Sequence, residues 1–151
     1  MKLEQVPFGH PDAVALRDEH VALGNQLYAS DPSALHRSGS EGIDPVSVIL
    51  TVVAYADHGP IGHACLRQLD DEVEIKRMYV VPSSRGSGVA DELLAAMEGA
   101  ARDAGAGRVI IHTGDRQLAA LTFYQRHGYT TIPVYPPYQD VTYSLCFEKP
   151  L

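Results

Sequence analysis

The sequence lacks the residues on which several classes of protein depend. It has no tryptophan and two cysteines, Cys65 and Cys146, too few for a disulfide framework or a four-cysteine zinc site. With 12 Lys and Arg against 19 Asp and Glu, it lacks the excess of cations that nucleic-acid binding requires. No apolar stretch is long enough to cross a membrane, and the first ten residues do not resemble a signal peptide. We therefore expect a cytoplasmic protein without nucleic-acid or membrane partners.

The residues that are present are typical of one globular domain. The 151 residues are 45% hydrophobic and 21% charged, which excludes a disordered or fibrous chain. We find no internal repeat and no low-complexity linker, so residues 1–151 are interpreted as a single domain with one core. The net charge of -7 weakly favours a cationic small substrate, although most acidic proteins are simply soluble.

Hydrophobic periodicity predicts a mixed α/β fold. Residues 31–44 should form a loop or a short second helix. Because a strand–helix–strand connection crosses over in the right-handed sense, strands 72–81 and 108–112 should be parallel in an otherwise antiparallel sheet. In chain order, the predicted elements are a strand at 3–7, a helix at 11–30, strands at 46–56, 61–69 and 72–81, a helix at 88–104, a strand at 108–112, a helix at 117–127, and strands at 129–134 and 141–147.

The most specific local pattern is the turn Arg85-Gly86-Ser87-Gly88-Val89-Ala90, between a predicted strand and a predicted helix. Glycines let the backbone approach a ligand, and the first amides of a helix carry partial positive charge. Lys76 and Arg77 should gather near Arg85, so the turn suits a diphosphate. The phosphate-loop Gly-Lys-Ser/Thr is absent, and Asp91 replaces the third glycine of the dinucleotide fingerprint. A tight turn without any ligand is an equally good interpretation of two glycines.

Three segments in order complete a larger pattern: Glu74-Ile75-Lys76-Arg77-Met78-Tyr79-Val80, then Arg85-x-x-Gly88-x-Ala90, then Ala120-Leu121-Thr122-Phe123-Tyr124 before Gly128-Tyr129. This combination resembles the GNAT superfamily of acyl-CoA-dependent N-acyltransferases over about residues 46–148. The resemblance implies a single N-acetyltransferase domain with a mostly antiparallel sheet flanked by helices. It also implies a splayed central parallel strand pair, with acetyl-CoA in the resulting cleft.

The resemblance further implies which residues hold acetyl-CoA. Gln117 stands where many members have asparagine, and its extra methylene leaves this contact open. The backbone of Met78, Tyr79 and Val80 would hold the acetyl and pantetheine groups, and Arg85 with the amides of Gly86, Ser87, Gly88, Val89 and Ala90 would hold the pyrophosphate.

Two residues are candidates for the proton transfers of acyl transfer. By resemblance, Tyr124 would protonate the departing thiolate, since a phenol with a pKa of about 10 stays protonated at neutral pH. Its helical spacing from Leu121 equally suits a core aromatic. With strict alternation along the strand, Glu74 should point to one face of the sheet, toward the cleft or solvent. The other face should carry Val73, Ile75, Arg77 and Tyr79. Glu74 is then either the base, acting through water or binding the cation, or a solvated strand carboxylate.

The segment Tyr135-Pro136-Pro137-Tyr138 and His112 are candidates for binding the acceptor amine. The segment is either a rigid aromatic wall or a stiff surface loop. His112 would contact substrate or act as a base, or else be a satisfied structural histidine. The seven histidines show no ligand spacing, so no metal site is predicted. Cys65 and Cys146 are interpreted as buried hydrophobic residues.

The leading hypothesis is an N-acetyltransferase that moves an acetyl group from acetyl-CoA to a primary amine of a small molecule or peptide. No residue stands out as a nucleophile for a covalent intermediate, so attack should be direct, within a ternary complex. The alternatives are a non-catalytic acyl-CoA sensor of the same fold, and a nucleotide- or NAD-binding domain. Many proteins that resemble this one pair as dimers, so a homodimer stays open, without separate support from the sequence.

Overall fold

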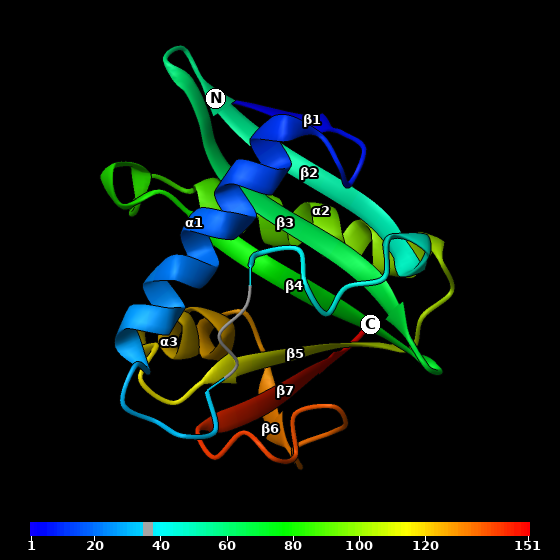
Figure 1. The fold of residues 1–151 in the computed structure, drawn as a ribbon. Coiled ribbons are helices and arrows are strands. Elements are labelled where there is room, and N and C mark those ends of the chain that lie inside the picture. The colour runs from blue at the N-terminus through cyan, green and yellow to red at the C-terminus, as the bar shows by residue number, and fades with distance from the viewer. Residues whose placement is uncertain (35–37) are drawn as a thin grey trace.

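The computed structural model describes residues 1–34 and 38–151, and within these residues seven strands form one sheet (Figure 1). The strand order across the sheet is β1-β2-β3-β4-β5-β7-β6. The strands are β1 (Lys2–Gln5), β2 (Val48–Ala56), β3 (Gly59–Leu69), β4 (Glu72–Val80), β5 (Arg108–Gly114), β6 (Thr130–Ile132) and β7 (Ser144–Pro150). The helices are α1 (Pro11–Leu27), α2 (Val89–Asp103) and α3 (Leu118–Arg126), with short 3-10 turns at Pro45–Ser47 and Pro82–Ser84.

The strands β4 and β5 are the parallel pair that the sequence predicts, and the other neighbouring strands are antiparallel. Their pairing runs from Val73 with Val109 to Ile75 with Ile111 and goes no further, although β4 continues to Val80 and β5 to Gly114. The two strands therefore part in the middle of the sheet. This confirms the mixed, mostly antiparallel sheet with a central splayed pair.

Helices cover both faces of the sheet (Figure 1). On one face, Leu93, Leu94 and Met97 of α2 and Tyr124 of α3 belong to the main hydrophobic core. On the other face, α1 packs Ala13 and Leu16 against the sheet in a second, smaller cluster. The described residues contain no helix long and apolar enough to span a bilayer.

A β-bulge interrupts β4 at Arg77. Cys65 pairs with Lys76 and His63 with Tyr79, so β4 has one residue more than β3 between these two pairs. Arg77 has a φ of 54°, a conformation that a bulge can impose on a non-glycine residue. As a result Tyr79 packs beneath α1 rather than on the face of Ile75. The predicted strict alternation along this strand is therefore wrong beyond Lys76.

The predicted elements match the observed ones within a few residues. The main differences are at the ends of helices and strands: α1 ends at Leu27 rather than residue 30, and β7 begins at Ser144 rather than residue 141. Between residues 31 and 44 the described residues form turns, and positions 35–37 lie outside the described residues.

Candidate active site

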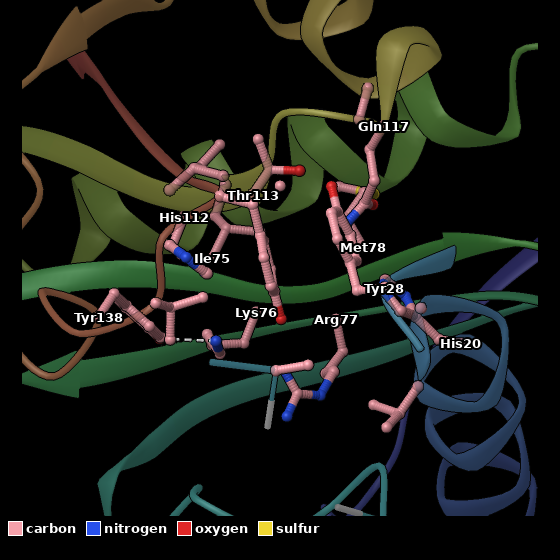
Figure 2. Close-up of a pocket in the computed structure, with 18 of the residues that line it drawn as sticks. His20, Tyr28, Ile75, Lys76, Arg77, Met78, His112, Thr113, Gln117 and Tyr138 are labelled. Carbon is pink, nitrogen blue, oxygen red and sulfur yellow. Dashed lines mark hydrogen bonds between the residues drawn. The ribbon is translucent and has the colours of Figure 1, made fainter. Parts of the chain in front are cut away.

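A cavity of about 170 Å³ opens where β4 and β5 part (Figure 2). Its walls come from residues 75–78 of β4 and residues 111–114 of β5, so the splayed pair forms its centre. The second half of α1 contributes His20, the residue after the helix is Tyr28, and α3 contributes Tyr124. Tyr138 and Tyr143, from the chain just before β7, close the remaining side. The cavity therefore collects side chains from segments that are distant in the sequence.

The turn between β4 and α2 leaves its amides free to bind a ligand. Gly86 and Gly88 have φ values of 79° and 87°, which explains the glycines because other residues are strained in this region. Within the described chain, no protein group accepts a hydrogen bond from the amides of residues 86–90. Val89 is the first residue of α2, so these amides also lie at the positive end of the helix dipole. The arrangement matches an anion site.

The three cations predicted to gather at this turn do not do so. Arg85 lies there, and its Nε donates to the carbonyl oxygen of Val80 at 3.0 Å. Lys76 instead points toward Tyr138, and Arg77 donates from Nε to the carbonyl oxygen of Gly39 at 2.9 Å. The bulge accounts for the direction of Arg77, whereas Lys76 precedes the bulge and shares the side of Glu74, toward Tyr138.

The residues predicted to hold the cofactor take different positions around the cavity. Met78 and Gln117 line it. Tyr79 lies in the cluster beneath α1, and Val80 belongs to the main core. The Val80 carbonyl already accepts the hydrogen bond from Arg85, so it has less capacity left for pantetheine than the prediction assumed.

Tyr124 is both a core residue and a cavity residue. It is 4% exposed, it packs edge-on to Phe123 and Tyr129, and it also lines the cavity. In the described part of the chain we find no hydrogen-bond partner for its hydroxyl. Burial raises the pKa of Tyr124, so the phenol keeps its proton throughout the neutral range. The core interpretation is therefore correct, and the same side chain also reaches the cavity, where its role as proton donor stays a prediction.

Glu74 is fully buried, so the predicted exposure to cleft or solvent is wrong. One carboxylate oxygen accepts from Arg67 Nε at 2.8 Å, and the other accepts from the Tyr135 hydroxyl at 2.6 Å. Tyr138 also donates to Glu74, at 3.3 Å. Arg67 lies directly across from Glu74 in the β3–β4 register. An arginine and a glutamate at paired positions of a predicted hairpin could have indicated this ion pair from the sequence. Glu74 does not line the cavity.

The Tyr135-Pro136-Pro137-Tyr138 segment covers Glu74 and forms one wall of the cavity. The peptide bond between the two prolines is cis. Tyr138 is buried, lines the cavity and stacks on His112, with ring centroids 3.7 Å apart and an interplanar angle of 5°. Tyr135 lies outside the cavity, in a hollow near Arg108. Tyr138 thus lies in the cavity wall and Tyr135 does not, and the binding of an acceptor by this segment or by His112 stays a prediction.

Lys76 is a cavity residue whose position the sequence analysis missed. It is 8% exposed, and its Nζ donates to the Tyr138 hydroxyl at 2.6 Å, the contact drawn as a dashed line in Figure 2. The same ammonium lies 4.7 Å from the centre of the Tyr138 ring. Burial lowers the pKa of Lys76 to about 7; Glu74 opposes this shift, and Arg77 and Arg67 add to it. No strand pattern distinguishes such a lysine from a solvated one.

Comparison with known proteins identifies the family. The family model described as "Acetyltransferase (GNAT) family" matches residues 17–129, which is most of the chain. The chain belongs to the GNAT acetyltransferase family. An uncharacterised N-acetyltransferase of Mycobacterium tuberculosis is 34% identical over 124 residues, which cover 82% of this chain and 74% of the relative.

Other relatives of this GNAT chain match over a shorter length. An IAA acetyltransferase of Azospirillum brasilense is 36% identical over 78 residues, 52% of this chain and 51% of that protein. An uncharacterised N-acetyltransferase of Bacillus subtilis is 33% identical over 81 residues, 54% of this chain and 56% of that protein. The matched part of the chain thus spans about half the length of each of these two curated relatives.

Solved structures show the same GNAT fold over the whole chain. A Klebsiella pneumoniae protein described as an acyl-CoA N-acyltransferase has a TM-score of 0.79 and 27% identity, covering 99% of this chain and 97% of that one. A GNAT acetyltransferase from Elizabethkingia anophelis, crystallised with acetyl-CoA bound, has a TM-score of 0.68 and 19% identity, covering 99% and 97%. At 19% identity, the similarity to the Elizabethkingia protein shows a shared fold alone.

Proposed function

We propose that this GNAT protein transfers an acetyl group from acetyl-CoA to a primary amine of a small molecule or peptide, by direct attack within a ternary complex. The observation that carries the proposal is the set of amides at residues 86–90, which have no protein acceptor in the described chain. They follow β4 after the short 3-10 turn Pro82–Ser84, and the second half of β4 lines the cavity. An anion site and a cavity between parting strands suit a long ligand with a diphosphate at one end and a reactive group at the other.

Acetyl-CoA fits the groups that the protein offers. The turn amides and Arg85 would bind the diphosphate. Beyond Ile75, β4 has no β5 partner, so backbone groups on that edge, those of Met78 first, are available to the amides of pantetheine. Gln117, at the start of α3, lies where it can contact the same arm. The Elizabethkingia neighbour, crystallised with acetyl-CoA, supports this choice of donor.

In the proposed reaction the nitrogen of the neutral amine attacks the thioester carbonyl carbon. A C–N bond forms, the C–S bond breaks, and the thiolate of coenzyme A leaves. Tyr124 gives its proton to the thiolate, a transfer that its raised pKa makes uphill, so the phenolate must be reprotonated at once by the proton that the amine releases. The amine's proton passes by way of water or of His112, which lines the cavity. Glu74 is covered by Tyr135 and Tyr138, so we assign it to holding the wall rather than to proton transfer.

The proposal is tested by thiol release from acetyl-CoA with a panel of primary amines. Tyr124→Phe should lower kcat by about 100-fold and leave the affinity for coenzyme A unchanged, because only the proton donor is lost. Tyr55→Phe is the matched control, since it removes a hydroxyl that bonds to Asp12 outside the cavity. It should keep wild-type kcat.

Two outcomes would count against this function. Equal kcat for wild type and Tyr124→Phe would remove Tyr124 from the mechanism. Tight binding of acetyl-CoA without amine-dependent thiol release across the panel would support the non-catalytic sensor instead.

A further inference from the structure

We propose that the amine acceptor also carries a carboxylate, and that this carboxylate pairs with Lys76 in the cavity. The inference rests on the proposed function and adds the chemical class of the acceptor to it.

The cavity is cationic although the chain as a whole is acidic. Among the described lining residues, Lys76 and Arg77 are the basic ones, and no aspartate or glutamate lines the cavity. A bound carboxylate would favour the protonated form of Lys76, whose pKa burial lowers to about 7. His20, which also lines the cavity, is neutral because burial and nearby cations lower its pKa to about 3. The net charge of -7 is therefore spread over other parts of the molecule, and the local field inside the cavity attracts anions.

Lys76 is a buried cation that lacks a carboxylate partner within the described chain. Its ammonium donates to the Tyr138 hydroxyl, and no carboxylate of a described residue lies within ion-pair distance. The nearby carboxylate, that of Glu74, is already engaged by Arg67 and by the hydroxyls of two tyrosines. A buried charge without a partner is costly, and a ligand carboxylate would supply the missing charge-assisted hydrogen bond.

The position of Lys76 assigns this carboxylate to the acceptor rather than to the acyl group. Ile75 packs into the core beneath α2 and α3, where Tyr124 also lies. Lys76 follows it on the strand and therefore faces the opposite side of the sheet, toward Tyr138. A thiolate protonated by Tyr124 leaves on one side of the gap, so the incoming amine should approach from the other, where Lys76 lies.

Four aromatic side chains also stand in the cavity wall. Tyr28 and Tyr143 stack with centroids 3.7 Å apart, and Tyr138 stacks on His112 at the same distance. All four side chains line the cavity. A small amino acid, with an apolar or aromatic body between its amine and its carboxylate, matches this lining better than a polyamine does.

The test compares amines in matched pairs, each an amino acid and the amide of the same compound. With wild-type protein and acetyl-CoA, kcat/KM should be about tenfold or more higher for the acid, mainly through KM. Lys76→Met should abolish this preference, because KM should rise much more for the acid than for the amide. Lys76→Arg should retain part of the preference because it retains the charge. Lys2→Met, which removes an equally charged but exposed lysine, should retain all of it.

Binding measured without turnover separates this inference from the proposed function. The probes are an N-acetylated amino acid and its amide, titrated by calorimetry into wild type and into both Lys76 variants, with folding checked by circular dichroism. Binding of the acid that depends on the charge at position 76 supports the site even if no amine releases thiol, in which case the proposed function alone fails. Turnover of acids and amides with equal kcat/KM would overturn the inference and leave the function intact.

A further experiment tests whether the carboxylate belongs to the acyl group of the donor instead of the acceptor. Succinyl-CoA and acetyl-CoA are compared as donors to a neutral amine. A preference for succinyl-CoA that disappears in Lys76→Met would place the carboxylate on the acyl group and overturn its assignment to the acceptor.

Discussion

A buried ion pair between Arg67 and Glu74 holds Tyr138 in the cavity wall. Arg67 and Glu74 are each almost inaccessible to solvent, and their contact of 2.8 Å joins neighbouring strands. Tyr138 is tied to both, since its hydroxyl accepts from Arg67 at 3.1 Å and lies 3.3 Å from Glu74. Burial, followed by the charge of Glu74, raises the pKa of Tyr138, so its phenol keeps its proton at physiological pH. The ion pair thus fixes the aromatic ring against which His112 stacks.

Replacing Glu74 should therefore destabilise the fold. In Glu74→Gln, Arg67 stays buried without its counter-charge, and the free energy of unfolding should fall by about 3 kcal/mol. Glu72→Gln is the control on the same strand, because Glu72 pairs with Arg108 where both side chains are about one-third exposed. It should cost less than about 1 kcal/mol. Urea denaturation measures both, and equal losses in the two variants would contradict the role given to Glu74.

Among the elements, β4 shows where sequence reasoning reaches its limit. Its existence, its place beside β5 and the turn that follows it were all predictable from hydrophobic periodicity and glycine placement. The bulge at Arg77 was not, because an extra residue in a ladder leaves no mark on composition. It reversed the expected facing of Tyr79 and turned Arg77 away from Arg85. The burial of Glu74 was hidden for a related reason, since it depends on chain more than 60 residues away.

The N-terminus of α2 offers a direct test of the anion site. Gly88 is unsuitable for it, because a φ of 87° strains any side chain placed there. Ser87 is exposed and is not in the positive-φ region, so Ser87→Asp adds a negative charge without that strain. An acidic residue near a helix N-terminus is stabilising, so the melting temperature should stay the same or rise slightly.

The same charge should weaken coenzyme A binding, because it repels the diphosphate. We expect the Kd, measured by calorimetry, to rise about tenfold or more in Ser87→Asp. Ser87→Asn is the control of equal size, and its Kd should stay within about threefold of wild type. A Kd in Ser87→Asp equal to that in Ser87→Asn would mean that the diphosphate lies elsewhere.

For the whole molecule, the topology was predicted correctly and the site only in part. The order of elements and the parallel pair follow from periodicity and from the handedness of crossover connections, which are local or general rules. The cavity, by contrast, is assembled from α1, β4, β5, α3 and the chain before β7. Which side chains meet there depends on packing between these elements. For this reason Tyr138 and Met78 were found by the sequence, whereas the inward position of Lys76 was not.

The account depends most on where coenzyme A binds, and a crystal structure of the protein with coenzyme A measures that directly. We predict that the diphosphate oxygens lie within about 3 Å of the amide nitrogens of residues 86–90. The pantetheine arm should enter between β4 and β5, with the sulfur next to the Tyr124 hydroxyl. A diphosphate bound away from this turn, or a thiol end outside the cavity, would contradict the proposed site and the mechanism built on it.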